Sequence, residues 1–363
     1  MWRILGKTSD VSSKETKAVK SLERYFSVVR DELPARFKVC KKTPVEINLD
    51  EDITELWKSH DKALEDFCEL LARVDKGKVK LDEISTPKRS LLDLKCEISD
   101  RILESCHFCE HSCKVDRKEG ETGICGVSKY PKIASEFVHM GEEPELVPSY
   151  TIFFSGCTLK CQFCQNWDIS QNPETGQESS PKKISSLISK RRENGVKNVN
   201  WVGGDPTPNL HNVLASLKEC EVNIPSVWNS NMYLSEEGMK LLSGTQDIYL
   251  TDFKYGNDEC AQKYSKIPNY WKVLTRNHKL AFDDSDLIIR HLILPEHVEC
   301  CTKPILNWIA ENLDLSTRIN IMDQYRPAGR ARKYQELSRP ITGDEMDRAI
   351  EIAQENGLKN VIR

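Results

Sequence analysis

The sequence has no long apolar run, no excess of charge of either sign, and no repeated or low-complexity segment. A membrane-spanning helix needs about eighteen or more consecutive apolar residues, and no such stretch is present. The start of the chain lacks the apolar core of a signal peptide, so we expect a cytoplasmic protein. With 52 Lys and Arg against 56 Asp and Glu, composition gives no signal for a nucleic-acid or membrane partner.

The length of 363 residues is enough for one large α/β domain with an appendage. Residues 1–89 are polar and show helical apolar spacing at 22–29 and 56–74, which predicts a helical N-terminal extension without a chemical motif. Residues 90–149 begin with a helical pattern and continue as a cysteine-rich segment, which we expect to bind metal. Residues 150–363 form the predicted main domain.

From residue 150 onward, short apolar runs alternate with amphipathic helical patterns, which is typical of parallel βαβ units. The predicted strands are residues 151–155, 198–202, 226–229, 247–251, 287–294 and 318–322, with a further short one at 359–362. The predicted helices between and after them include 185–194, 235–242, 303–312 and 343–356. Six parallel strands with outer helices predict a partial (β/α)6 barrel of the TIM type, whose active site lies at the carboxyl ends of the strands.

The chain has fourteen cysteines, and a reducing compartment makes a disulfide framework a poor explanation for them. Directly after the first predicted strand, residues 154–166 read F-S-G-C-T-L-K-C-Q-F-C-Q-N, and the three cysteines of this loop are Cys157, Cys161 and Cys164. Three thiolates are one short of a closed four-iron cluster or a structural zinc site. The loop therefore predicts a 4Fe-4S cluster with one open iron, which can chelate the amino and carboxylate groups of a methionine moiety.

Two other residues of this loop suit a cofactor site. Gly156 permits a tight exit from the strand. Phe163, just before the last cysteine, has a ring that could lie against an adenine.

On these residues the chain resembles the radical S-adenosylmethionine (SAM) superfamily, and within it the uncharacterised iron-sulfur proteins similar to pyruvate formate-lyase activating enzyme. The resemblance covers roughly residues 90–363. It implies that an electron passed to the cluster cleaves SAM into methionine and a 5′-deoxyadenosyl radical, which removes a hydrogen atom from a substrate. It also implies a reductant such as flavodoxin or ferredoxin.

The resemblance assigns cofactor-binding roles to the ends of the following strands. Gly203, Gly204 and Asp205, in the sequence G-G-D-P, are similar to the superfamily's G-G-E-P motif for the SAM ammonium, with Asp in place of Glu. Asn229 lies in a turn similar to the family's T-N-G. Asp252 is followed two residues later by Lys254, similar to the family's D-x-K, and residues at this spacing share one face of a strand. The alternative for that last pair is a solvent-exposed ion pair.

Two later strand ends carry further candidates. Arg290 is our candidate for the methionine carboxylate, because a guanidinium forms paired hydrogen bonds with it. Tyr325 follows the sixth predicted strand in the sequence Q-Y-R-P. His291 and His297 lie near the same strand end, and for them a structural role is as good an interpretation as a role in cofactor binding.

A second cysteine group precedes the main domain. Cys106, Cys109, Cys113 and Cys125 supply four soft ligands in twenty residues, which suits either a structural zinc or a second iron-sulfur cluster. A second cluster could relay electrons to the first, whereas zinc would pin the extension to the main domain. The other cysteines are interpreted as packing residues, namely Cys40, Cys68, Cys96, Cys220, Cys260, Cys300 and Cys301.

Three functions remain open from the sequence. The first, implied by the resemblance, is hydrogen-atom abstraction from a protein or peptide, with glycyl radical formation on a partner enzyme as its specific version. The second is modification of a small molecule, a lipid or an RNA by the same radical. The third is a non-catalytic electron carrier or redox sensor, against which the open iron argues.

Overall fold

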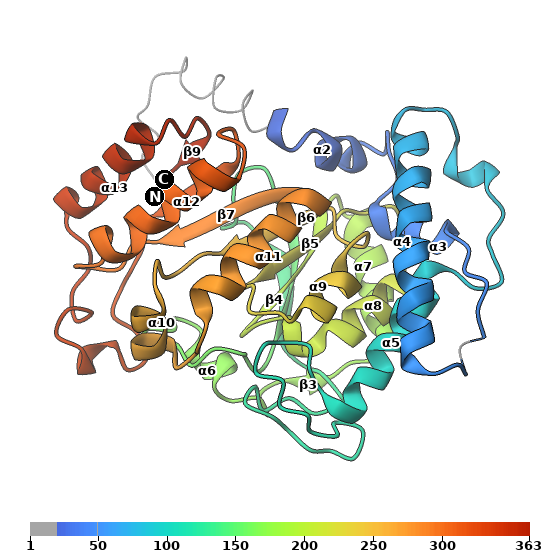
Figure 1. The fold of residues 1–363 in the computed structure, drawn as a ribbon, viewed down its shortest axis with the longest axis horizontal. Coiled ribbons are helices and arrows are strands. Elements are labelled where there is room, and N and C mark those ends of the chain that lie inside the picture. Colours follow the sequence, from blue (N-terminus) through green and yellow to red (C-terminus); the bar gives the residue numbers. More distant parts are fainter. Residues whose placement is uncertain (1–19, 49) are drawn as a thin grey trace.

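The computed structural model describes residues 20–48 and 50–363, and it shows an α/β fold built on one nine-stranded sheet (Figure 1). The strand order is β3-β1-β2-β4-β5-β6-β7-β8-β9. Seven strands from β2 to the end of this order run parallel to one another, as the βαβ pattern predicts. They are β2 (Ser149–Phe154), β4 (Asn198–Gly203), β5 (Ser226–Ser230), β6 (Ile248–Asp252), β7 (Asp286–Leu292), β8 (Arg318–Met322) and β9 (Val361–Ile362).

Two antiparallel strands complete the sheet, and the sequence did not predict them. β1 (Lys132–His139) pairs with β2, and β3 (Gln177–Glu178) pairs with β1. β1 has several exposed side chains and no fully buried one, so it lacks the apolar run that marks the parallel strands. It lies within residues 90–149, and this segment thus extends the sheet of the following domain.

Helices cover the sheet and connect its strands (Figure 1). Those before the sheet are α2 (Glu23–Val29), α3 (Arg36–Lys42), α4 (Ile53–Asp75) and α5 (Leu91–Ile102). Those within it are α6 (Trp167–Ser170), α7 (Pro181–Glu193), α8 (Leu210–Glu219), α9 (Glu236–Leu242), α10 (Asp258–Ser265), α11 (Tyr270–Asp284), α12 (Lys303–Asn312) and α13 (Gly343–Glu355). Ser90 and Thr342 form capping boxes at α5 and α13, which fixes where these helices begin. None of the described helices is long and apolar enough to cross a membrane.

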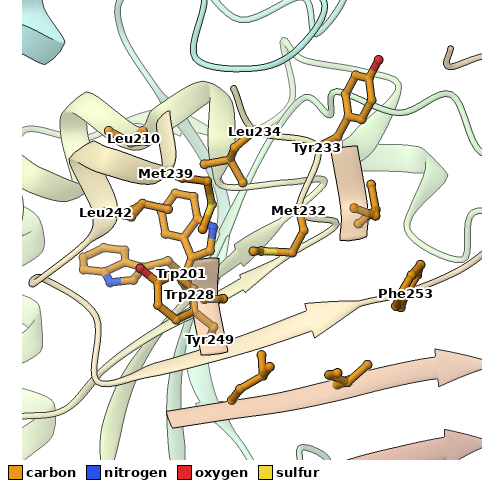
Figure 2. Close-up of a cluster of buried hydrophobic side chains, with 14 of the residues drawn as sticks. Trp201, Leu210, Trp228, Met232, Tyr233, Leu234, Met239, Leu242, Tyr249 and Phe253 are labelled. Carbon is orange, nitrogen blue, oxygen red and sulfur yellow. The ribbon is translucent and has the colours of Figure 1, made fainter. Parts of the chain in front are cut away.

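A large buried core joins the helices to the sheet. Figure 2 shows part of it, where Trp201 of β4, Trp228 of β5 and Tyr249 of β6 meet Met239 and Leu242 of α9. All five side chains are buried. The N-terminal helices belong to the same cluster, through Phe37 of α3 and Phe67 of α4 among others. Burial of this extent fixes the strand ends relative to one another, which is what a site built across them requires.

An acidic segment between β1 and β2 lies against the sheet. Glu142 accepts hydrogen bonds from Asn200 on β4 and from Arg290 on β7. β5 and β6 separate these two strands in the sheet, so one side chain reaches two strands that are not neighbours. Glu143 and Glu145 of the same segment are buried, and they pair with Arg290 and Arg318 respectively.

Candidate active site

The cluster loop begins where β2 ends, beside the end of β4. The amide nitrogens of Gly204 and Asp205 donate to the carbonyl oxygens of Phe154 and Gly156, at 2.8 and 3.0 Å. A Cβ atom on Gly203 would collide with the backbone of Phe154, and one on Gly204 would collide with the backbone of Gly156. The two glycines of G-G-D-P therefore hold the second strand end directly against the loop that carries the cysteines.

The three cysteines of the cluster loop lie together and are shielded from solvent. Cys157 is buried, and Cys161 and Cys164 are partly buried. Burial raises the pKa of Cys157 well above its usual value, and the neighbouring Asp205, Cys161 and Cys164 raise it further. Burial raises the pKa of Cys161 to about 11, while the positive charge of Lys254 opposes the rise. Binding of iron to these thiols would displace their protons.

Each of the three sulfur atoms has a polar partner from another part of the chain. Ser265 of α10 donates to Cys161 Sγ at 2.9 Å, and Ser170 Oγ lies 3.2 Å from Cys164 Sγ. The side-chain amide of Asn231 donates to Cys157 Sγ at 3.6 Å. Hydrogen bonds to cluster sulfurs orient the ligands and tune the reduction potential. The thiols thus sit in surroundings that fit an iron-sulfur cluster.

The predicted pair at the end of β6 lies beside these thiols. Lys254 Nζ is 2.5 Å from Asp252 Oδ2, and both side chains are partly shielded rather than fully exposed. Burial works to lower the pKa of Lys254, but Asp252, Cys161 and Cys164 raise it above its ordinary value. The ammonium therefore remains charged, within the electrostatic reach of two cluster cysteines.

Asp205 is fully engaged by the turn around it. Its Oδ1 accepts from the Thr207 amide at 2.9 Å, and its Oδ2 accepts from the Asn231 amide at 2.9 Å and from the Ser230 hydroxyl at 3.2 Å. Burial raises the pKa of Asp205, and these donors oppose the rise. The carboxylate therefore ties the end of β4 to the end of β5, where predicted Asn229 is also buried.

Comparison with protein families agrees with this geometry. A model described as the radical SAM superfamily matches residues 151–309, the part of the chain from β2 into α12. Residues 151–309 form a domain of the radical SAM superfamily. Membership implies an enzyme that holds a 4Fe-4S cluster and SAM, and the cysteine loop at the start of the matched region is where this chain offers thiols for the cluster.

Two curated proteins of Methanocaldococcus jannaschii are similar to this radical SAM protein. Uncharacterized protein MJ0674 is 45% identical over 343 residues, which is 93% of this chain and 98% of the relative. Uncharacterized protein MJ0808 is 28% identical over 181 residues, or 44% of this chain and 52% of the relative. The first similarity extends almost from end to end, so the N-terminal helices and the cysteine-rich segment fall largely within it.

Among solved structures, SuiB of Streptococcus suis is similar over part of this radical SAM protein. The crystal structure of SuiB bound to its precursor peptide SuiA gives a TM-score of 0.41 at 16% identity, covering 55% of this chain and 43% of SuiB. The structure of SuiB bound to S-adenosylmethionine gives the same TM-score, with 44% of SuiB covered. This chain therefore spans less than half the length of SuiB.

Three other residues predicted for the cofactor already have partners within the chain. The guanidinium of Arg290 is paired with Glu142 and Glu143, so a methionine carboxylate would have to displace one of them. The hydroxyl of Tyr325 donates to the Leu337 carbonyl at 2.7 Å, and its ring lies 5.9 Å from that of Phe163. Phe163 is itself buried, among Tyr255 and Tyr325.

The four cysteines of the upstream group lie within electrostatic reach of one another, in an irregular segment as expected. Burial raises the pKa of Cys109 well above its usual value, and the neighbouring Cys125, Cys106 and Cys113 raise it further. This group touches the cluster loop. A Cβ on Gly156 would lie 2.8 Å from the Cys125 carbonyl, and His111 Nε2 is 2.7 Å from the Thr158 carbonyl.

The sequence missed several residues that the structure brings to the site. Asn231, Ser170 and Ser265 contact the cluster sulfurs, yet none belongs to a motif that names such a role. The role of Asn231 could have been predicted, because it lies in the same turn as Asn229. Ser265 was not, because 104 residues separate it from Cys161.

Proposed function

We propose that this protein is a radical SAM enzyme that abstracts a hydrogen atom from a protein or peptide, in the manner of the glycyl radical activating enzymes. The observation that carries the proposal is the set of three thiols, Cys157, Cys161 and Cys164, with Lys254 beside two of them. When bound there, the cluster supplies the electron that breaks a carbon–sulfur bond of SAM, giving methionine and a 5′-deoxyadenosyl radical that takes the substrate hydrogen.

The residues of this chain would hold and orient the cofactor. Cys157, Cys161 and Cys164 hold three irons, and the charged Lys254 offers a partner for the methionine carboxylate. Gly203, Gly204 and Asp205 fix the turn that faces the cluster loop. Burial of Cys157 and partial burial of Cys161 and Cys164 would limit the access of water and oxygen to the reduced site.

We also propose that the sheet forms the partial (β/α)6 barrel of this superfamily. Glu142 supports it, because its bonds to β4 and β7 join side chains from strands that two others separate, as a sheet curved around this residue would allow. In such a barrel the ends of β2, β4, β5 and β6 would surround one site.

A macromolecular substrate is supported by the surface next to the cluster loop. Trp167, the first residue of α6, follows Cys164 by three positions, and 51% of its surface is exposed. An exposed indole beside a reactive site offers a contact for a partner chain. The relationship to activating enzymes supports the same substrate class, together with a flavodoxin or ferredoxin as reductant.

We infer that the four upstream cysteines bind metal, as zinc or as a second iron-sulfur cluster. Their contacts with the cluster loop suit both roles, since a cluster there would pass electrons onward and zinc would brace the loop. Iron, sulfide and zinc analysis of anaerobically purified protein would separate the two.

The decisive experiment is cleavage of SAM by the reconstituted and reduced protein. We expect 5′-deoxyadenosine to form, and Cys161→Ala to abolish its formation because the variant lacks one of the three cluster ligands. Cys68→Ala, at an exposed cysteine of α4, is the matched control and should keep full activity. If Cys161→Ala cleaves SAM as fast as the wild type, the assignment of Cys161 as a cluster ligand is wrong.

A second variant tests the substrate class. Trp167→Ala should leave the slow uncoupled cleavage of SAM unchanged and lower the yield of radical on a co-purified partner protein. An equal radical yield in the variant and the wild type would show that Trp167 does not contact the partner, and the absence of any protein radical in the wild type would argue for a small substrate instead.

A further inference from the structure

A second group of potential metal ligands lies outside the cluster loop and the upstream cysteines. Among the described residues, Cys260, His297 and Cys300 have one donor atom each, and the three donor atoms all lie within 4.8 Å of one another. They come from two segments: Cys260 from α10, and His297 and Cys300 from the start of a π-helix, η4 (Val298–Thr302), for which His297 is the N-cap. No sequence pattern relates the three residues, and Cys260 and Cys300 were both interpreted as packing residues.

The histidine is oriented as a metal ligand would be. His297 Nδ1 lies 2.7 Å from the Pro295 carbonyl, which can only accept, so Nδ1 carries the proton and donates it. This leaves the lone pair on Nε2, which is 3.0 Å from the Tyr264 hydroxyl. Ligating histidines in proteins are fixed in this way, with the remote nitrogen donating to a carbonyl or carboxylate.

A fourth donor is at hand. Cys301 Sγ is 4.0 Å from Cys300 Sγ, and the side chain of Asn257 contacts both cysteines, through Cys301 Sγ at 3.9 Å and the Cys300 carbonyl at 2.7 Å. π-Helical turns are often found at functional sites, and this one brings two adjacent thiols to the same helix, α10.

We propose that Cys260, His297 and Cys300, with Cys301 as the fourth ligand, bind a thiophilic divalent cation, Zn²⁺ in the cell. Three thiolates and an imidazole are a common tetrahedral set for structural zinc. Neighbouring ligands of one Zn²⁺ are about 3.5–4 Å apart, so the donor atoms of Cys260, His297 and Cys300 need to close by about 1 Å. Cys301 Sγ lies outside this group of three and has to rotate further to join it.

The site would tie the loop after β7 to the cluster loop. α10 carries Cys260, and its last residues hold the cluster loop through hydrogen bonds from the amides of Lys160 and Gln162 to Ser265 and Tyr264. Ser265 also donates to Cys161 Sγ. Zn²⁺ at one end of this short helix would therefore restrain the element that positions a cluster sulfur at its other end.

The test counts zinc, and it needs neither SAM nor an assembled cluster. Wild type and Cys300→Ser are purified from zinc-supplemented cells, dialysed against a weak chelator and analysed by mass spectrometry for zinc per chain. Cys300 is exposed, so its replacement should not disturb the core. We expect Cys300→Ser to contain one equivalent less than wild type, and Cys68→Ser, the matched exposed control, to contain the same amount.

Cobalt gives an independent reading. Addition of Co²⁺ to the metal-free protein should produce thiolate-to-cobalt charge-transfer absorption. In Cys300→Ser and in Cys260→Ser this absorption should be lower than in Cys68→Ser by the contribution of one bound cobalt. Equal zinc and equal cobalt absorption in all variants would overturn the proposal. A disulfide between Cys260 and Cys300 in protein kept under reducing conditions would overturn it as well. Failure to cleave SAM would contradict the proposed function, but it would not affect the zinc content measured in this test.

Discussion

Each sulfur of the cluster loop has its own polar neighbour, and these neighbours come from three different parts of the chain. Ser265 offers the shortest of the contacts, at 2.9 Å from Cys161 Sγ. A hydrogen bond to a thiolate ligand stabilises the more negative, reduced cluster more than the oxidised one. The identity of residue 265 should therefore be visible in the reduction potential.

We expect Ser265→Ala to make the potential of the reconstituted cluster more negative. If the bond favours the reduced state by about 1 kcal/mol, the change is roughly 40 mV for one electron. A redox titration followed by electron paramagnetic resonance measures it. Ser316→Ala, at an exposed serine remote in sequence from the loop, should show no change, and a potential unaltered in Ser265→Ala would mean that this hydroxyl does not act on the cluster.

At the scale of residues, the sequence predicts which residues are cluster ligands better than it predicts which residues contact one another. The spacing of Cys157, Cys161 and Cys164 indicates their shared ligand role without any structure. Arg290 shows the opposite case, because its position on a strand suggested a cofactor carboxylate while its partners in the fold are Glu142 and Glu143. Those glutamates precede it by nearly 150 residues, and no local pattern relates them.

At the scale of elements, the packing of the β4 turn on the β2 turn is the most constrained contact near the site. Gly204 has no room for a Cβ, which would meet the backbone of Gly156 and lie 2.8 Å from Ser170 Cα. Backbone cannot yield as a flexible side chain can, so any substitution must push the cluster loop away.

We expect Gly204→Ala to lower the iron content of the reconstituted protein and to destabilise the fold by about 1–3 kcal/mol, the usual cost of overpacking. Gly343→Ala is the matched control, since a Cβ there meets nothing within 4 Å. Iron analysis and urea denaturation of both variants give the comparison. Full iron loading in Gly204→Ala would show that the loop tolerates displacement.

The acidic segment makes a prediction about pH. Burial works to raise the pKa of Glu142, but Arg290 and His139 overcome it and lower the pKa from 4.5 to about 2. A carboxyl with a depressed pKa stabilises the folded state above the unfolded pKa, and this contribution is lost as pH falls from about 4.5 towards 2.

We therefore expect Glu142→Gln to cost on the order of 3 kcal/mol near neutral pH, and the difference from wild type to shrink as pH approaches 2. Urea denaturation of the metal-free proteins across this range measures it. Glu69→Gln, at an exposed glutamate of α4, should follow wild type throughout. If the free energy of unfolding of Glu142→Gln is lower than that of the wild type by the same amount at every pH, the destabilisation comes from packing rather than from charge.

The parallel strands were predictable because each is a short apolar run between helices, and the prediction is confirmed for all seven, from β2 to β9. β1 escaped prediction since its pairing with β2, rather than its own composition, makes it a strand.

At the scale of the whole molecule, the N-terminal helices share one core with the sheet. The ring of Phe67 is fully buried, fills the space beside Gly244 ahead of β6, and has the Arg36 guanidinium 5.6 Å from its centroid. A helix packed in this way should unfold together with the sheet rather than before it.

We expect Phe67→Ala to lower the free energy of unfolding of the whole chain by about 3–5 kcal/mol, the usual range for a buried Phe. Circular dichroism and the absorption of the bound cluster, recorded during one thermal scan, should shift down together. Cys68→Ser, at the next and exposed position, should leave both unchanged. A cluster signal that keeps its wild-type midpoint would show that the extension melts alone.

The buried glutamates between β1 and β2 also bear on how the protein is made. Glu143 and Glu145 find their arginines 147 and 173 residues further along the chain. A ribosome that has finished β2 and the cysteine loop still has to synthesise β7 and β8 before those acids can be neutralised. Docking of the acidic segment against the sheet must then wait until β8 has been synthesised.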